Sequence, residues 1–431
     1  MPQRILLILV GLLPAGLLLA QPFTIVMLPD TQNYVDFTRQ KAAGFALDSS
    51  DLYLRHMEHF ACRGVANGGD VVFVAAVGDV WQHVLRGTDP EHESRGVRSV
   101  GGNAGFSALI KADETLNFEI PMAVRGYRLL RAAGVPFGVP PGNHDYDAWW
   151  TAPVAGTVAA DAGPDALANV PPENQEIHVG GLEAFKEAFG SDSEFFRDEN
   201  WYVAAFNGGT SSAQIFSADG YRFLHVALEM QAGDPVLAWA QQVLDDHPGL
   251  PTLVSTHDYL SKRGERRPLD NMDLALADPG YNNDAETIWR NFISRNDQIF
   301  MVLCGHQAGQ ALRVDQNEAG HAVYQILADY QDRGQAGLDA NQPPGPNGRP
   351  AAIGDGWYRE MTFDLAGESP RVQIRTYSTH YRAYSSELAT YAKWYKAQEQ
   401  PGMSDAEFLR ADEFALDLAD FRGRFGAGGS E

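Results

Sequence analysis

The sequence predicts an α/β fold in which two mixed β-sheets pack face to face and helices flank them on the outside. Short, continuously apolar runs alternate with helical patterns along residues 23–304, and such runs are typical of strands buried on both faces. Farther along the chain, apolar and polar residues alternate, which is typical of half-exposed antiparallel strands. Two packed sheets flanked by helices accommodate both patterns.

The individual elements follow from these patterns in chain order. The apolar runs predict strands at residues 23–28, 71–77, 135–139, 201–206, 221–228, 253–256 and 298–304. Helical periodicity falls between them at residues 51–65, 123–133, 235–244 and 288–294, and Pro235 suits the first turn of its helix. The alternating stretches at residues 361–365 and 372–376 predict the half-exposed strands.

The composition excludes several classes of protein. Of the 431 residues, 44% are hydrophobic and 11% are aromatic, which is too many for an intrinsically disordered chain. The 33 Lys and Arg against 56 Asp and Glu give a net charge of −23, so no nucleic-acid duplex is expected as a partner. Because an acidic surface repels phosphate groups, any phosphate chemistry requires a local cationic site such as a metal ion.

Residues 1–20 have the pattern of a secretory signal peptide. Arg4 provides a positive charge, an apolar run follows it, and Ala20 offers a small residue for cleavage. The alternative is an N-terminal membrane anchor, which usually needs about 20 apolar residues. We therefore expect a secreted or periplasmic protein with no membrane span after cleavage. One disulfide between Cys62 and Cys304 is conceivable, but two small buried apolar residues are the favoured interpretation.

The rest of the chain is expected to form one catalytic domain at residues 21–384. Residues 84–118 and 151–182 lack clear periodicity and are expected to be insertion loops. Residues 385–431 are expected to be an extension that packs on the domain and has a disordered end. Within it, Ser404 and Glu407 fit a helix capping box, whereas Phe414, Leu416 and Leu418 alternate as in a strand, and the choice stays open.

Residues with metal-binding side chains follow five of the predicted strands, and these residues are Asp30, Asp79, Asn143, His257 and His306. Ligands bind at the carboxyl edge of open α/β sheets, and carboxylate, amide oxygen and imidazole are ligands of hydrolytic divalent metals. Each residue alone has an ordinary interpretation, such as a helix cap, a turn or a buried histidine. Their joint placement predicts a metal-dependent hydrolase, because a metal pair polarises a phosphoryl oxygen and activates water.

The ordered blocks around these residues resemble the calcineurin-like metallophosphoesterases, whose signature runs Asp-x-His, Gly-Asp, Gly-Asn-His-Asp/Glu, a lone His and Gly-His-x-His. The blocks in this chain are Asp30-Thr31-Gln32, Gly78-Asp79, Gly142-Asn143-His144-Asp145, Thr256-His257-Asp258 and Gly305-His306-Gln307-Ala308. Stretches at residues 327–331 and 356–359 are similar to those of secreted members whose first block is Asp-Thr-Gln. The resemblance covers residues 23–377 and implies a metallophosphoesterase-like four-layer sandwich.

The resemblance implies two adjacent metal sites that share one carboxylate. Asp79 would bridge the two ions. The first site would hold Asp30, and the second site would be completed by Asn143, His257 and His306. The ions expected are one or two divalent cations, of Mn, Mg, Fe, Zn or Ca.

The resemblance also implies residues that act on the substrate. His144 would protonate the leaving oxygen or bind phosphate, since a histidine pKa lies close to working pH. Asp145 would belong to the catalytic set by orienting His144 or its loop. His83 follows the Gly-Asp block and would contact phosphate together with Asn143, although a solvent-exposed loop histidine is an equal alternative for His83.

Two positions depart from the family pattern. Gln32 and Ala308 stand where the family has histidines, and both imidazoles would have served the first site. The carbonyl of Gln32 is a candidate ligand there, and Gln307 and Gln310 are near enough in sequence to supply a further oxygen. Oxygen ligation suits Mg²⁺, Mn²⁺ or Ca²⁺ better than Zn²⁺, so the first site is expected to be the weaker one. A degenerate relative that binds without turnover is the alternative.

The substrate is expected to be a small phosphorylated molecule, either a phosphomonoester or a phosphodiester. The two insertions follow site blocks and would surround the pocket mouth. Trp149 and Trp150 would stack on a base or sugar, or else be buried core. A serine hydrolase is not expected, because the chain has no Gly-x-Ser-x-Gly. The sequence leaves the oligomeric state open.

Overall fold

The computed structural model describes residues 21–36, 41, 44–84, 87–100, 112–267, 274–278, 280–345, 348–366 and 369–426. The expected signal peptide at residues 1–20 lies outside the described residues, as do residues 85–86 and 101–111 of the first insertion and residues 427–431 of the expected disordered end. No helix among the described residues is long and apolar enough to cross a membrane.

Seven of the described strands form the first sheet, in the order β15 (Ala383–Tyr384), β14 (Arg371–Ser378), β13 (Trp357–Asp364), β1 (Phe23–Leu28), β2 (Val71–Ala76) and β3 (Phe137–Gly138), with β16 (Phe414–Asp417) beside β14. The neighbours β1, β2 and β3 run parallel, whereas β13 runs antiparallel to both β1 and β14. The first sheet is therefore mixed.

Seven more of the described strands form the second sheet, in the order β11 (Gly309–Gln316), β12 (Ala322–Asp329), β10 (Ile299–Cys304), β9 (Thr252–Ser255), β8 (Tyr221–Ala227), β7 (Ser211–Ala218) and β6 (Tyr202–Phe206). Strands β8, β9, β10 and β12 run parallel, and the outer strands pair antiparallel. Two large mixed sheets with helices confirm the coarse prediction of an α/β sandwich.

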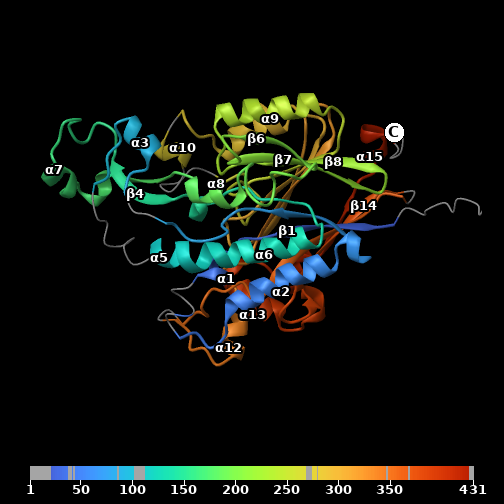
Figure 1. The fold of residues 1–431 in the computed structure, drawn as a ribbon. Coiled ribbons are helices and arrows are strands. Elements are labelled where there is room, and N and C mark those ends of the chain that lie inside the picture. Colours follow the sequence, from blue (N-terminus) through green and yellow to red (C-terminus); the bar gives the residue numbers. More distant parts are fainter. Residues whose placement is uncertain are drawn as a thin grey trace, which may run out of the picture.

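Helices cover the outer face of each sheet (Figure 1). Apolar side chains fill the space between the sheets. On the first sheet lie α2 (Ser49–Cys62) and α6 (Ile120–Ala132), and on the second lie α9 (Asp234–Asp246), α11 (Ala285–Ile288) and a π-helical turn at Trp289–Ile293. The layer between the sheets includes Ile25, Phe73, Phe223, Met301 and Ile326. Burial of these side chains is the main source of stability.

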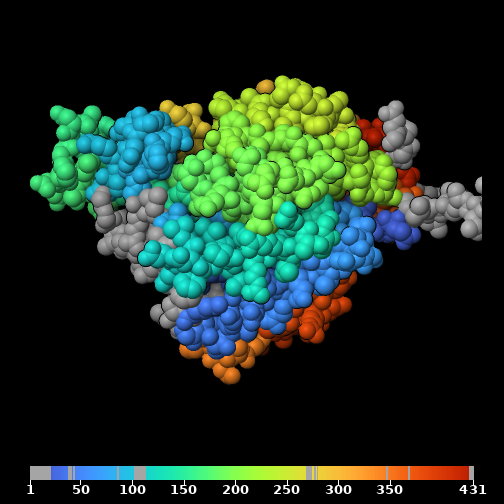
Figure 2. All heavy atoms as spheres, in the orientation of Figure 1, coloured from blue at the N-terminus to red at the C-terminus, as the bar shows by residue number. Residues whose placement is uncertain are grey.

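Part of the second insertion is a β-hairpin, so the expectation of a loop at residues 151–182 is wrong there. Strand β4 (Ala148–Pro153) pairs antiparallel with β5 (Gln175–Gly180), and α7 (Pro164–Ala168) lies between them in sequence. Trp150 of β4 stacks on His178 of β5, with ring centroids 4.6 Å apart. The hairpin, α3 (Pro90–Ser94) and α10 (Leu274–Ala277) form a lobe at one end of the sandwich (Figures 1 and 2).

The C-terminal segment contains both elements between which the sequence left the choice open. A capping box of Ser404 and Glu407 begins α14 (Asp405–Asp412), and β16 follows it directly. Helices α13 (Tyr391–Glu399) and α15 (Phe421–Phe425) complete this segment, and Tyr391 and Phe421 are buried in the core between the sheets.

Short helices occupy the connections of the described chain, namely α1 (Gln32–Val35), α5 (Ala112–Glu114), a π-helical turn at Thr115–Glu119, α8 (Glu183–Phe189), α12 (Gln335–Asp339) and 3₁₀ turns at Val65–Asn67, Asn143–Asp145, Pro172–Asn174 and Ser385–Glu387. Both cysteines are free thiols, and Cys304 is buried while Cys62 is exposed. The expectation of two buried cysteines is therefore wrong for Cys62, which lies at the end of α2.

Candidate metal centre

The structure brings the five residues expected at strand ends to one edge of the two sheets. Asp30, Asp79 and Asn143 follow the parallel strands β1, β2 and β3 of the first sheet. His257 and His306 follow the parallel strands β9 and β10 of the second sheet. Because parallel strands end at the same edge, side chains that are far apart in sequence meet there.

Four of these side chains form a compact cluster of candidate ligands. Asp79, His257 and His306 each offer one ligand atom, and the three atoms lie within 4.8 Å of one another. Oδ1 of Asn143 lies 3.0 Å from Nε2 of His257 and 2.9 Å from Nδ1 of His306. One carboxylate, one amide oxygen and two imidazoles that converge in this way match the donor set of a divalent metal site.

The backbone adopts uncommon conformations at the cluster. Asp79 has a φ of 53° and His306 a φ of 70°, in the left-handed region that costs most residues about 1 kcal/mol or more. Glycines allow the close approach of the loops: a Cβ on Gly142 would lie 2.3 Å from Oδ1 of Asp79, and one on Gly305 would lie 2.1 Å from Oδ1 of Asp30. Strain of this kind gathers at functional sites.

Asp79, His257 and His306 shift one another's pKa values. Burial raises the pKa of Asp79, but His257 and His144 outweigh burial and hold that pKa well below its usual range. Burial lowers the pKa of His257, but Asp79 and Asp30 outweigh it and raise the pKa to about 10. Burial lowers the pKa of His306 to about 4, so its imidazole is neutral at pH 7. The cluster therefore holds a positive charge on His257 that a metal ion would replace.

Asp30 and Gln32, which the sequence assigns to the first site, lie beside this cluster. Oδ2 of Asp30 accepts a hydrogen bond of 3.0 Å from the backbone N–H of His306. Burial, and then the charge of Asp329, raise the pKa of Asp30. The side-chain amide of Gln32 donates a 3.1 Å hydrogen bond to Oδ2 of Asp79. The structure thus brings Gln32 to the carboxylate of Asp79 and Asp30 to the backbone of His306.

Gln331 is a residue of this site that the sequence reasoning missed. It lies in the loop that follows β12, and its amide contacts Gln32 and donates to Oδ2 of Asp30 at 3.3 Å. Gln310, one of the two residues expected to supply an additional oxygen, contacts the guanidinium of Arg333 instead. The signal that could have found Gln331 is its place just beyond a buried strand, in the Leu327–Gln331 stretch.

His144 lies at the exposed side of the cluster. Its backbone N–H donates a 2.8 Å hydrogen bond to Oδ1 of Asp79, and its Nε2 lies 3.9 Å from Oδ2 of the same carboxylate. Nδ1 of His144 is hydrogen-bonded to the side-chain carbonyl of Gln82. The His144 side chain is 24% exposed and that of His306 is partly buried, whereas that of His257 is fully buried. His144 is therefore accessible from the solvent side of the cluster.

Asp145 and His83 are buried next to the cluster and contact the loops that carry its residues. The carboxylate of Asp145 is fully buried and accepts three backbone hydrogen bonds, from Val80, Trp81 and Gly142. It therefore fixes the loops that carry Asp79 and Asn143. His83 is also buried and stacks on His144 with ring centroids 5.1 Å apart. Burial lowers the pKa of His83 to about 3, so it is neutral, and the alternative of a solvent-exposed loop histidine is wrong.

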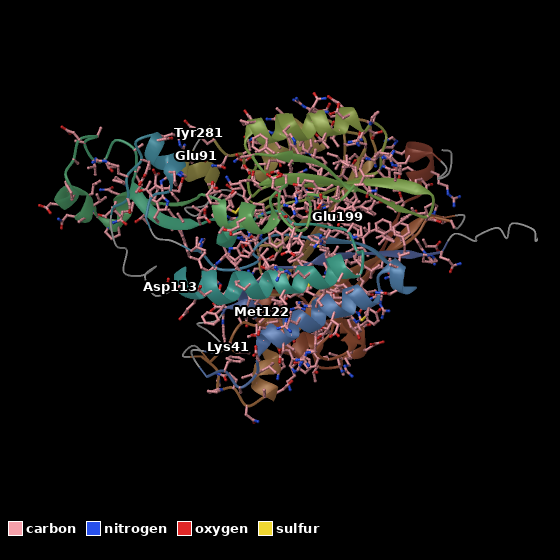
Figure 3. The ribbon with its side chains drawn as sticks, in the orientation of Figure 1. Lys41, Glu91, Asp113, Met122, Glu199 and Tyr281 are labelled. Carbon is pink, nitrogen blue, oxygen red and sulfur yellow. The ribbon has the colours of Figure 1, made fainter. Side chains whose placement is uncertain are left out.

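A cavity of about 780 Å³ opens beside this edge, between the lobe and the second sheet. Its lining includes Tyr146, three residues after Asn143, and Glu229, which follows β8. Glu91 and Tyr281, both labelled in Figure 3, line it from the lobe side. Trp149 and Trp150, by contrast, are 9% and 3% exposed, which supports buried core as their interpretation.

Comparison with known proteins gives few matches. No family model matches the chain. Over 264 residues, which are 60% of its length, the chain is 25% identical to the "Uncharacterized protein YvnB" of Bacillus subtilis (strain 168). The matched region spans 15% of that relative's length. Since the relative's name states no activity, a function for this chain has to be argued from the site itself.

Proposed function

We propose that the chain is a metal-dependent phosphoesterase of the calcineurin-like type, which hydrolyses small phosphomonoesters or phosphodiesters. The observation that carries this proposal is the convergence of Asp79, Asn143, His257 and His306 from the ends of four strands in two sheets. The resemblance of the sequence blocks supports the same assignment, with a weaker first site at Asp30 and Gln32. Export by the N-terminal apolar segment is part of this proposal.

A divalent ion held by these residues would polarise a phosphoryl oxygen and lower the pKa of water. His144 supplies the proton. Its Nδ1–H would donate to the carbonyl of Gln82, which stabilises the protonated ring, and the proton on Nε2 would pass to the leaving oxygen. Asp145 holds the loops of Asp79 and Asn143 together through the backbone N–H groups of Val80 and Gly142. Asn143 would contact the phosphate group.

The cavity beside the cluster would take the part of the substrate that does not react. Its lining carries five acidic residues, Asp89, Glu91, Glu183, Glu229 and Asp278, against the basic side chains of His92 and Lys186. Such a wall repels long polyanions, in agreement with the net charge of −23. A small neutral or cationic leaving group fits this lining better than a nucleic acid does.

The proposal is tested by hydrolysis of p-nitrophenyl phosphate and bis-p-nitrophenyl phosphate with added Mn²⁺. His144→Ala should lower kcat by about 10²–10⁴-fold while Mn²⁺ binding is kept, because only the proton donor is removed. Asn143→Ala should lower both activity and Mn²⁺ affinity. His321→Ala is the matched control, since that histidine pairs with Asp297.

Two outcomes would contradict the phosphoesterase assignment. If the wild-type chain binds Mn²⁺ but hydrolyses neither ester, the non-catalytic binding protein becomes the better description. That alternative is favoured by Gln32 and Ala308, which replace two histidines of the family pattern. If the chain binds no divalent metal ion, the phosphoesterase assignment fails and the non-catalytic binding protein is again the better description.

A further inference from the structure

Two oxygen atoms next to the ligand cluster are buried without a hydrogen-bond donor. Among the described residues, neither Oδ1 of Asp30 nor Oε1 of Gln32 has a hydrogen-bond partner, although both residues are 1% exposed. A buried polar atom without a partner costs about 1–3 kcal/mol. Buried carboxylates are generally paired with a positive group or coordinate a metal ion. These two oxygens are therefore suited to a cation.

The side chain of Gln331 is held in one orientation beside these oxygens. Its amide nitrogen donates to Oδ2 of Asp329 at 2.9 Å and to Oδ2 of Asp30 at 3.3 Å. The backbone N–H of Gln331 also donates to Oδ1 of Asp329 at 3.0 Å. With the amide nitrogen directed at two carboxylates, the carbonyl oxygen has to face Gln32, and it contacts the Gln32 amide.

The amide nitrogen of Gln32 lies between two oxygens, Oε1 of Gln331 and Oδ2 of Asp79. The Gln32 N–H groups thus place a partial positive charge between Oε1 of Gln331 and Oδ2 of Asp79, where a cation would otherwise lie. The two ends of a glutamine amide have the same shape, and a half-turn about the last bond exchanges Nε2 for Oε1. After that turn, Gln32 would present an oxygen to the same point.

We propose that Gln331 is a ligand of the first metal site, which then consists of oxygens alone, from Asp30, Gln32, Asp79 and Gln331. This inference rests on the proposed function, because the second site at His257 and His306 is assumed in it. Oxygen ligands select hard cations such as Mg²⁺, Mn²⁺ and Ca²⁺, whereas imidazoles suit Zn²⁺. The chain would therefore bind a hard cation at the first site and a cation such as Zn²⁺ at the second site, and the two sites would share Asp79.

The test counts Mn²⁺ ions bound to the purified full chain by electron paramagnetic resonance of free Mn²⁺. The wild type should bind two ions with unequal affinities. Gln331→Ala should weaken the weaker site at least about tenfold and leave the tighter site unchanged. Gln331→Glu, which keeps the shape and adds a charge, should strengthen the weaker site. Gln335→Ala is the matched control, because its amide donates to Asp339.

Further variants assign each ion to its site. His306→Gln should lose the tighter ion and keep the weaker one. Zn²⁺ should displace Mn²⁺ from the tighter site alone. If Gln331→Ala fails to fold, as judged by its thermal melt, the Gln331→Glu variant decides, and an unchanged weaker site in that variant overturns the proposal.

The count of bound Mn²⁺ ions distinguishes a failure of the oxygen-only first site from a failure of the proposed function. One Mn²⁺ per wild-type chain, together with ester hydrolysis, overturns the oxygen-only site and leaves the phosphoesterase assignment in place. Two ions with the same two affinities in Gln331→Ala as in the wild type also overturn it. An absence of any Mn²⁺ binding means that the proposed function itself is wrong.

Discussion

Asp79 reaches its position because two glycines make room for the loops around it. Gly78 precedes it with a φ of 100°, which favours glycine. Gly142 lies on its other side in an extended conformation, with a φ of −97° and a ψ of −176°. That conformation suits any residue, so Gly142 is required for space alone.

Gly142→Ala should abolish Mn²⁺ binding, because the new Cβ would lie 2.3 Å from Oδ1 and 2.5 Å from the backbone nitrogen of Asp79. The measurement is a Mn²⁺ titration alongside a thermal melt. Gly163→Ala is the control, since a Cβ there meets nothing within 4 Å. Retained Mn²⁺ affinity in Gly142→Ala would show that the loops at Asp79 move apart easily.

At this scale, the sequence predicted the placement of side chains that follow strands. Asp30, Asp79 and His257 could be placed together because strand ends share an edge. Gln331 was not placed with them, because a glutamine is a weaker indication of a metal site than an aspartate or a histidine, although Gln331 too lies just beyond a buried strand. Its place depends on the parallel pairing of β12 with β10. Paired positions such as Leu303 and Ile326 lie 23 residues apart, and that pairing was not predicted from the sequence.

Among the elements, the lobe depends on one buried histidine. His92 of α3 bonds to Asp89 at 2.6 Å through Nδ1 and to Asp278, just after α10, at 3.2 Å through Nε2. Arg95 also pairs with Asp278, and His178 of β5 packs against the ring of His92. Burial lowers the pKa of His92, but the hydrogen bonds to Asp278 and Asp89 outweigh burial and raise it to about 9.

The stability of the lobe should fall as the pH rises from about 6.5 to about 9. The pKa of His92 in the folded state is about 9, against an ordinary histidine value of 6.5, so protonation favours the folded state. This stabilisation is complete below pH 6.5 and is lost as the pH rises through 9. Thermal melts over this range should show the decline, and His92→Gln should flatten it.

His178→Gln is the control for the pH dependence. Burial lowers the pKa of His178 to about 4, so it does not titrate between pH 6.5 and pH 9. The decline should therefore persist in His178→Gln. The same slope in His92→Gln as in the wild type would show that another group is responsible.

Element boundaries could be predicted where apolar runs are continuous, as in β1, β2 and β10. Strand β7 (Ser211–Ala218) was not predicted, because it begins with polar residues that are nevertheless buried. Gln214 bonds to Ser212 at 2.8 Å and to His225 at 2.7 Å, and His225 bonds to Ser255 at 2.8 Å. Polar side chains that satisfy one another inside the fold give no hydrophobic pattern in the sequence.

Across the whole molecule, buried ion pairs join the C-terminal segment to the two sheets. Arg333 is 1% exposed and makes two hydrogen bonds, of 2.8 and 2.9 Å, to Glu399 at the end of α13. Arg359 of β13 pairs with Asp412 at the end of α14 at 3.0 Å. Asp412 also accepts a hydrogen bond of 2.6 Å from the hydroxyl of Tyr391. The segment is thus part of the core.

Glu399→Ala should lower the free energy of unfolding by about 3–5 kcal/mol, because it removes the hydrogen-bonded carboxylate of the buried Arg333 and leaves Asp412, 3.9 Å away, as its remaining counter-charge. Urea denaturation measures this loss. Glu183→Ala is the control and should cost at most about 1 kcal/mol, since Glu183 pairs with Lys186 at the surface and its side chain is 78% exposed. A loss below 1 kcal/mol in Glu399→Ala would show that the pair contributes little.

The anchor of Arg333 also sets an order of events during synthesis. Gln331 lies two residues before Arg333, and the loop that carries both is held by Glu399. While the ribosome is still making α13, the strands of both sheets other than β16 can pair, but Glu399 does not yet hold Arg333. A nascent chain would therefore gain this anchor late, and a product cut short before residue 399 would lack the buried carboxylate that holds the loop of Gln331 beside the proposed first site.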